Sequence, residues 1–312
     1  MNFNKLKSWK QRALIMYFLE DKSYKDIAET LNVPYDTVYG NIQRLGKVFS
    51  KQQLELLRPE PTIFVIGDTQ CKPTESLDYL DWVGNYIAIK QPDIIVHIGD
   101  HYDMASLSSY DRGKLSAEGK RIHEDIKAGD DGLAILDKHI KSVRGYNPRK
   151  VVCIGNHEER IMRHVQEHPE LAGFLSYDIL GFKEYGWEVH DYLKPVRIHG
   201  INFVHYLANP MSGKPLGGTA KSRLAKFRQS FVMGHQQLLD ICLEPMPLDP
   251  ERMQVGVVVG ACYPFDEAYK GYQGNNHFRG GVMLYEVGNG SALPMAVSLK
   301  HMQKKYMETL AH

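Results

Sequence analysis

Polar side chains follow five apolar runs of this sequence, at the point where each run ends. They are Asp68 and Gln70, Asp100 and Asp103, Asn156 and His157, His205, and His235 and Gln237. These side chains offer carboxylate, amide and imidazole donors but no thiolate, and such a set suits borderline-hard divalent ions such as Mn²⁺, Fe²⁺ or Zn²⁺. The pattern therefore predicts a metal site built from strand ends, which could hold a phosphoryl group and activate a water.

From residue 62 onward, strand-like runs alternate with amphipathic helical segments. TIFVIGD, DIIVHIGD and KVVCIGNHE are typical of buried strands, whereas TESLDYLDWVGNYIAIKQ and AILDKHIKSVRGY are typical of helices. The second half is richer in strands, with SFVMGHQ, VGVVVGACY and GGVMLYEV. Open α/β sheets place their ligands at the carboxyl ends of strands, so we expect the five strand ends to meet at one place. We therefore predict an α/β domain over residues 62–312.

The first 58 residues read as a separate helical domain. Helices are predicted over SWKQRALIMYFLEDK, over SYKDIAETLNV and over PYDTVYGNIQRLGKVFSKQQLELL. Ser23 precedes the second helix with Asp26 three residues on, which is a capping arrangement. Pro34 suits the first position of the third helix. Pro59 and Pro61 then disfavour helix, so we place the domain boundary between residues 58 and 62.

Two short helices joined by a tight turn resemble the helix-turn-helix of sigma-factor and repressor DNA-binding domains. The resemblance implies that the outward face of the third helix contacts DNA. The side chains on or near that face are Tyr35, Thr37, Tyr39, Gln43, Arg44 and Lys47. The alternative is a three-helix packing or dimerisation module with a solvated polar face.

Composition excludes several classes of protein. The 312 residues are 43% hydrophobic and carry a net charge of +1, so no global charge attracts the chain to nucleic acid or to acidic membranes. The four cysteines form no CxxC pair, which is typical of reduced thiols. No segment approaches the ~18 consecutive apolar residues of a membrane span. We expect a soluble cytoplasmic protein with no membrane partner, and the sequence leaves its oligomeric state open.

The strand-end motifs occur in the order GDTQ, GDHYD, GNHE, a single His and GHQQ. Together they resemble the calcineurin-like metallophosphoesterase superfamily over residues 62 to about 290. The segments GDHYDMASLSSYDRGK, GWEVH and VGACYPF are similar to phosphoesterases of tailed bacteriophages and prophages. The resemblance implies a four-layer α-β-β-α sandwich, here preceded by a small all-α helix-turn-helix domain. It also implies a place in the host cytoplasm if the chain is phage-encoded.

The resemblance implies a role for each strand-end residue. The implied ligands of a first divalent ion are Asp68, Gln70 and Gln237. The implied ligands of a second divalent ion are Asn156, His205 and His235. Asp100 would bridge the two ions. His157 would be the general acid that protonates the leaving oxygen. Asp103 would hydrogen-bond His157 and favour its protonated form, or would otherwise cap a turn.

The sequence departs from the family at Gln70 and Gln237, where the family usually has His. An amide oxygen in place of an imidazole should weaken the first metal position for Zn²⁺ and favour a harder ion, so we expect Mn²⁺, with Mg²⁺, Fe²⁺ and Zn²⁺ as alternatives. The first position would then fill only when substrate phosphate supplies further oxygens. The alternative is that both glutamines only hydrogen-bond around the site.

We therefore expect a metal-dependent phosphodiesterase, a DNA nuclease with a two-metal site and an N-terminal DNA-binding module. One alternative is a phosphomonoesterase acting on a phosphoprotein or a nucleotide. Another is a non-catalytic DNA-binding regulator that keeps the phosphoesterase fold as a binding platform. The sequence does not distinguish DNA from RNA, or cleavage from an end from internal cleavage.

Overall fold

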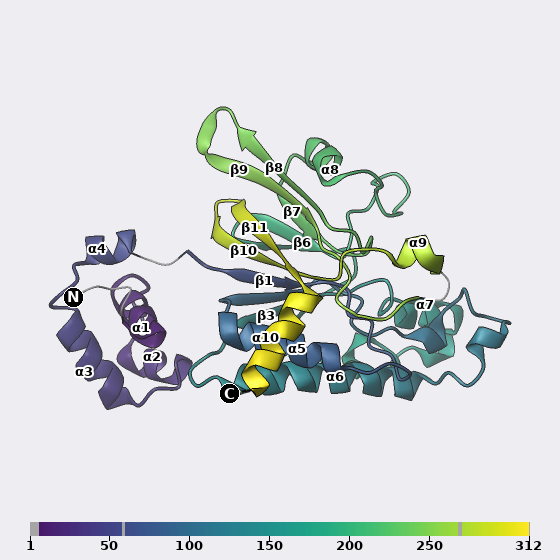
Figure 1. Cartoon of the computed structure of the whole chain (residues 1–312), viewed down its shortest axis with the longest axis horizontal. Helices are drawn as coiled ribbons and strands as arrows, with labels where there is room; N and C mark the ends of the chain where they lie inside the picture. Colours follow the sequence, from purple (N-terminus) through teal and green to yellow (C-terminus); the bar gives the residue numbers. More distant parts are fainter. Residues whose placement is uncertain (1–5, 58–59, 268–269, 312) are drawn as a thin grey trace. The chain divides into compact units, whose positions relative to one another are not determined.

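The computed structural model describes residues 6–57, 60–267 and 270–311. The chain forms two compact units (Figure 1). The first unit comprises Met1–Glu60 with Ile140–Asn147, and the second comprises Pro61–His139 with Pro148–His312. Within the described ranges, none of the helices has the length and apolar character needed to cross a membrane.

The first unit contains four helices over its described residues: α1 (Ser8–Phe18), α2 (Tyr24–Thr30), α3 (Tyr35–Leu45) and α4 (Lys51–Leu56). The predicted cap of α2 is confirmed, because Oγ of Ser23 accepts a hydrogen bond from the Asp26 amide at 3.2 Å while Asp26 accepts one from the Ser23 amide at 3.3 Å. Asn32 turns the chain with a φ of 48° between α2 and α3. The buried faces of the two helices meet through Ile27, Val38 and Ile42. Local capping and apolar spacing thus build the helix-turn-helix shape.

Two details of the helical prediction were wrong. Pro34 lies at the N-cap of α3 rather than at its first helical position, and the predicted long third helix is two helices. The helix stops because Gly46 occupies the C-cap of α3 and a second capping pair starts α4. In that pair the Ser50 side chain accepts from the Gln53 amide at 3.2 Å, and Oε1 of Gln53 accepts from the Ser50 amide at 2.9 Å.

The second unit contains a six-stranded sheet in the order β11-β10-β1-β2-β3-β4. Its strands are β1 (Ile63–Ile66), β2 (Ile94–His97), β3 (Arg149–Cys153), β4 (Glu188–His190), β10 (Gly280–Gly288) and β11 (Ser291–Ser298). The strands β1 to β4 run parallel, and β10 and β11 add an antiparallel hairpin beside β1. The carboxyl ends of β1, β2 and β3 therefore open at the same edge.

A second sheet has five strands in the order β5-β6-β7-β9-β8. They are β5 (Val196–Ile198), β6 (Ile201–Val204), β7 (Phe231–Met233), β8 (Asp240–Met246) and β9 (Asp249–Val258). The strands β6, β7 and β9 run parallel, while β5 and β8 form antiparallel hairpins with their chain neighbours. The ends of β6 and β7, which carry the last two predicted motifs, thus lie at one edge of this sheet.

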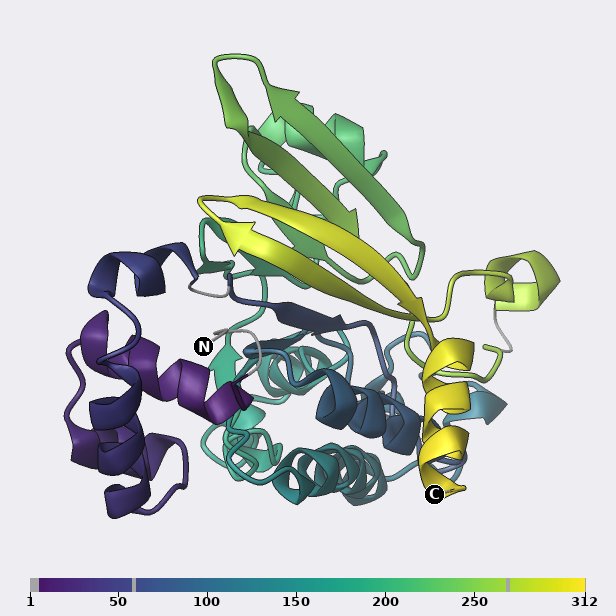
Figure 2. The same cartoon turned by 60° about the vertical axis from the view of Figure 1, so that its left-hand side comes forward.

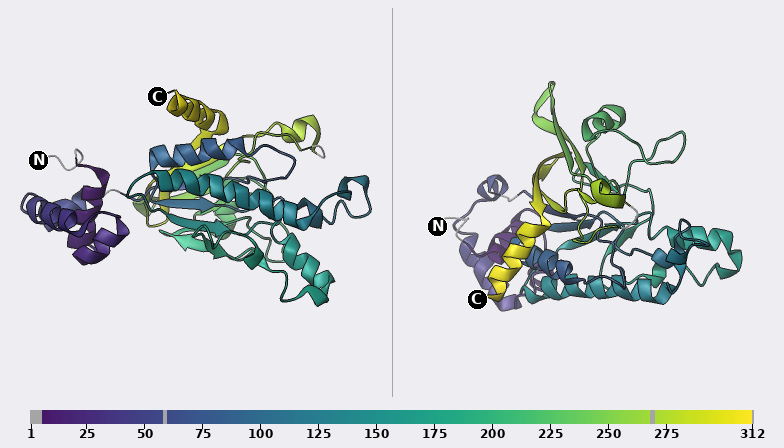
Figure 3. Two further views of the ribbon diagram at one scale, coloured as in Figure 1. Left: turned by 90° about the horizontal axis from the view of Figure 1, so that it is seen from below. Right: turned by 45° about the vertical axis from the view of Figure 1, so that its right-hand side comes forward.

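The two sheets pack face to face, and helices cover their outer faces (Figures 1 and 2). One core cluster takes Val65 and Val96 from the first sheet and Phe203 and Val257 from the second. The helix α8 (Ala220–Phe227) packs on the outer face of the second sheet. On the first sheet, α5 (Asp78–Lys90) lies between α6 (Ile122–Ser142) and α10 (Leu299–Leu310) (Figure 3). The predicted α/β fold with two sheets is confirmed.

Short helical segments make up most of the remaining regular structure between the strands. They are Ala105–Leu107, Leu115–Ala117, α7 (Arg160–Glu167), Pro169–Leu171, Tyr177–Ile179 and α9 (Gly271–Asn275).

Candidate metal centre

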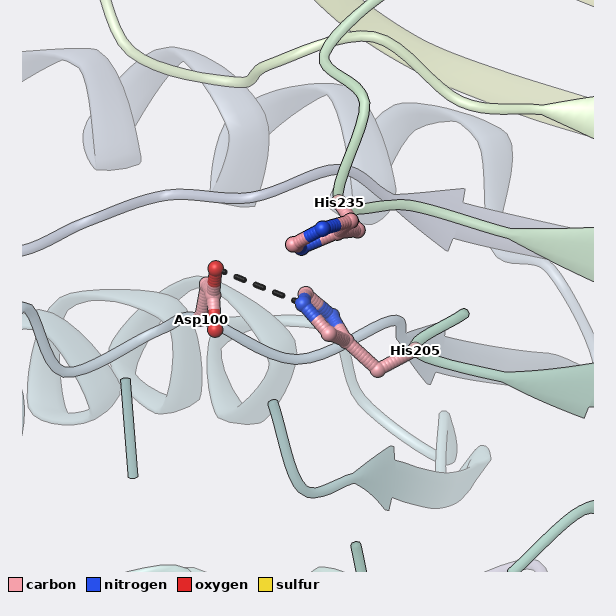
Figure 4. A group of neighbouring side chains, drawn as sticks. All are labelled: Asp100, His205 and His235. Carbon is pink, nitrogen blue, oxygen red and sulfur yellow. Dashed lines mark ion pairs between the residues drawn. The ribbon is translucent and has the colours of Figure 1, made fainter. Parts of the chain in front are cut away.

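The predicted strand-end residues of the second unit meet at one site. Asp68, Asp100 and Asn156 follow β1, β2 and β3 of the first sheet, and His205 and His235 follow β6 and β7 of the second. Within the described ranges, the donor atoms of Asp100, His205 and His235 all lie within 4.8 Å of one another (Figure 4). Chain segments separated by more than a hundred residues thus supply one cluster of metal-type donors.

The donors predicted for the second metal position face one another closely. Oδ1 of Asn156 lies 2.9 Å from Nε2 of His205 and 2.7 Å from Nδ1 of His235, and Oδ2 of Asp100 lies 3.4 Å from Nε2 of His205. Nδ1 of His205 donates to the Ile98 carbonyl at 2.9 Å, which directs Nε2 toward the cluster. One carboxylate, one amide and two imidazoles suit a borderline divalent ion.

Ionisable groups in this cluster shift one another's pKa values. Burial alone would lower the pKa of His205, but the Asp100 carboxylate outweighs it and raises that pKa to about 9. Burial likewise opposes ionisation of Asp100, yet His157 and His205 hold its pKa below the usual range. A bound divalent ion would take over the role of the His205 proton, because an imidazole must be neutral to bind a metal.

Two oxygens predicted for the first metal position lack partners. Oδ2 of Asp68 and Oε1 of Gln70 are buried and have no hydrogen-bond partner among the described residues. The other Asp68 oxygen accepts from the His235 amide at 3.2 Å. Burial and the Asp100 carboxylate raise the pKa of Asp68 to about 7. Buried oxygens are rarely left unpaired, so this pair fits a cation that both would contact.

Gln237 is placed differently from the other predicted ligands. Its Oε1 accepts a hydrogen bond from the Tyr263 hydroxyl at 2.9 Å and another from the ammonium of Lys270. The structure therefore brings Gln237 to the edge of the site but engages its oxygen with two donors from the chain that follows β9. The sequence held no signal for Lys270, since it lies in a segment without any of the strand-end motifs.

His157 and Asp103, predicted as general acid and its partner, lie within hydrogen-bond distance of each other. Nδ1 of His157 lies 2.9 Å from Oδ1 of Asp103 and Nε2 lies 3.7 Å from Oδ2 of Asp100, so the ring stands between two carboxylates. Burial disfavours the imidazolium, but Asp100 and then Asp103 outweigh it and raise the pKa of His157. Arg160 lies 3.2 Å from Nε2 and limits that rise. The two carboxylates thus favour the protonated form of a ring whose Nε2 faces the metal cluster.

Several of these residues have an unusual backbone conformation. Positive φ angles occur at Gln70 (45°), Asp100 (52°), His235 (66°) and Gln237 (57°). The left-handed region costs energy for residues other than glycine, and it clusters at functional sites where surrounding structure imposes it. The sharp turns direct these side chains back across the ends of the strands.

Glu158 is a site residue that sequence reasoning missed. Its Oε1 accepts from the amides of His101 and Tyr102 at 2.7 and 2.9 Å, and its Oε2 accepts from Asp100 and Gly155 at 3.1 and 2.9 Å. The carboxylate is fully buried and joins the loop after β2 to the loop after β3. Its place directly after His157 in GNHEER was the available signal, since an acid inside a buried motif needs donors.

The predicted DNA-contacting side chains are exposed in the first unit. Thr37, Tyr39, Gln43 and Arg44 lie on α3, while Lys47 lies two residues beyond its end. Tyr39 stacks on Tyr35 with ring centroids 6.4 Å apart. The face is thus accessible and partly aromatic.

Comparisons with known proteins agree with these features. Residues 61–256 match the family described as calcineurin-like phosphoesterase, and residues 3–45 match sigma-70, region 4. The gene 54 protein of Mycobacterium phage L5 is 26% identical over 179 residues, which cover 55% of this chain and 68% of that protein. One solved crystal structure aligns with 77% of this chain and with 100% of that structure's own chain at 14% identity. Its TM-score is 0.30, which is too low to indicate a shared fold.

Proposed function

Because this chain belongs to the calcineurin-like phosphoesterase family, we propose that it is a metal-dependent phosphodiesterase that cuts DNA. One observation carries the proposal: a buried cluster of metal-type donors occurs in the same chain as a helical region that matches sigma-70, region 4. Contacts between such a helical module and DNA phosphates raise the local concentration of DNA, even though the protein as a whole is not basic. We further propose that residues 1–58 and 62–312 fold as separate domains.

The proposed metal centre has two positions. Asn156, His205, His235 and the shared Asp100 would hold one divalent ion, and Asp68 with Gln70 would face the other. Mn²⁺ suits both donor sets best, with Mg²⁺, Fe²⁺ and Zn²⁺ as alternatives. When bound, such ions supply Lewis-acid stabilisation of phosphoryl oxygens and lower the pKa of water.

The protein's own residues would move the remaining proton. Although burial opposes it, Asp100 and Asp103 raise the pKa of His157 and so favour its protonated form. Its Nδ1–H donates to Asp103, which keeps Nε2 directed at the site. We propose that Nε2 protonates the leaving oxygen of the cleaved ester, with Asp103 as the positioning residue. Likeness to a phage protein supports the further proposal that this reaction takes place in the host cytoplasm.

The test is hydrolysis of labelled single- and double-stranded DNA with Mn²⁺, Mg²⁺ or Zn²⁺, beside the His157→Ala variant. We expect Mn²⁺-dependent cleavage that falls by about 10²–10⁴-fold in the variant, while DNA binding is unchanged. Cleavage of a mono-aryl phosphate but not of a bis-aryl diester or DNA would replace the nuclease with a phosphomonoesterase. DNA binding without hydrolysis in any metal would indicate that the protein is a non-catalytic DNA-binding regulator.

A further inference from the structure

The two glutamines that replace the family's usual histidines have different surroundings. Oε1 of Gln70 is buried without a partner among the described residues. Oε1 of Gln237 instead accepts from the Tyr263 hydroxyl and from the Lys270 ammonium, which itself lies 3.2 Å from that hydroxyl. An amide oxygen has two lone pairs, and both are used here. Gln237 could bind a metal only if one of these donors left.

Described residues before and after Lys270 in the sequence are anchored within the same unit. Before it, Glu267 forms an ion pair with Lys72 at 2.5 Å, and both side chains are largely buried. After it, the guanidinium of Arg279 donates to the Tyr263 carbonyl at 2.9 Å. Lys72 follows β1 closely in the sequence, so the ion pair ties Glu267 to the strand end that carries Asp68. Glu267 and Arg279, which lie before and after Lys270 in the sequence, are therefore both held by polar contacts.

The ammonium contacts a residue predicted for the first metal position, because it donates to Oε1 of Gln237. The Asp68 carboxylate acts electrostatically on Lys270, and Asp68 contributes one of the two unpaired oxygens of that position. Lysine is a compact point charge, and like charges repel strongly where water is excluded. A divalent ion beside Asp68 and Gln70 would therefore meet a positive charge supplied by the protein itself.

We propose that Gln237 is not a metal ligand but a holder for Lys270, whose charge stands beside the first metal position and weakens it. The protein then binds one divalent ion tightly, at Asp100, Asn156, His205 and His235, and a second ion weakly. This proposal rests on the proposed metal-dependent function and concerns the occupancy of the same centre.

The test is calorimetric titration of metal-stripped, full-length protein with Mn²⁺, together with elemental analysis of the metal that remains after desalting. Wild type should retain one equivalent and bind a second at least about tenfold more weakly. Lys270→Met should tighten the second equivalent by about tenfold or more, whereas Lys270→Arg keeps the charge and should not. Gln237→Leu should not weaken binding of the second equivalent. Lys226→Met, an exposed lysine of α8, is the matched control.

Several outcomes would overturn the proposal. They are two equivalents of equal affinity in wild type, a second equivalent unchanged by Lys270→Met, and a second equivalent weakened by Gln237→Leu. Thermal unfolding of each variant checks that it is folded, and Lys270→Arg separates loss of charge from loss of packing. A protein that binds Mn²⁺ in the expected pattern but cuts no DNA would remove the proposed substrate and leave this inference standing. Retention of no metal by wild type would overturn both.

Discussion

Replacing Glu158 by Gln should destabilise the phosphoesterase unit far more than an ordinary conservative substitution. The Glu158 carboxylate accepts four backbone amides, two on each oxygen, from the loops that follow β2 and β3. A glutamine has one accepting oxygen, and its NH₂ group would face the other two amides. The substitution therefore leaves two buried N–H groups unpaired and opposes them with further donors.

The expected loss follows from these contacts. Each buried unpaired group costs about 1–3 kcal/mol, so two cost about 2–6 kcal/mol. Burial and the Asp100 carboxylate raise the pKa of Glu158, so losing its charge recovers part of this cost. In a unit of this size, each kcal/mol lowers Tm by about 2–4 °C, which gives a net decrease of about 5–15 °C for Glu158→Gln.

Differential scanning calorimetry of the full chain would measure the change, with Glu118→Gln as the control. Glu118 is exposed, and its substitution should leave Tm unchanged. If Glu158→Gln unfolds within about 2 °C of wild type, the four-amide interaction does not stabilise the loops and the reasoning is refuted.

Three further changes test other parts of the structure. Gly155→Ala would place a methyl carbon 2.1 Å from Oδ1 of Asp100, so we expect a lower Tm and loss of the retained metal. In the control variant Gly217→Ala the added methyl group enters open space, so neither property should change. Equal behaviour of the two variants would contradict the close approach of Gly155 to Asp100. Ser23→Ala should lower protection of α2 amides from hydrogen exchange by about 1 kcal/mol, and unchanged protection would show that the capping box contributes nothing. Arg44→Ala should weaken DNA binding and lower the slope of log affinity against log salt concentration by about 1. The control variant Lys226→Ala should leave both the affinity and the slope unchanged. If Arg44→Ala does not alter the slope, α3 is not part of the DNA interface.

Much of the fold could be predicted because it depends on local patterns. The capping pair of Ser23 and Asp26 and the apolar spacing of Val38 and Ile42 each involve residues within one or two helical turns, and the structure confirms them. The break between α3 and α4 was missed although the Ser50–Gln53 pair was readable, because Gly46 alone does not end a helix reliably.

The sequence by itself determined which residues end the strands, and therefore which donors could meet. Short apolar runs followed by Asp68, Asp100 or His205 identify strand ends, because strand periodicity and glycine turns are encoded locally. Only the tertiary structure decided how each donor is used. Lys270 contacts Gln237, which is 33 positions away in the sequence, and Glu158 contacts His101, which is 57 positions away. Such pairings depend on how the sheets and loops pack rather than on any local pattern. The two glutamines therefore differ in their surroundings, since Oε1 of Gln70 has no partner among the described residues whereas Oε1 of Gln237 accepts from Lys270.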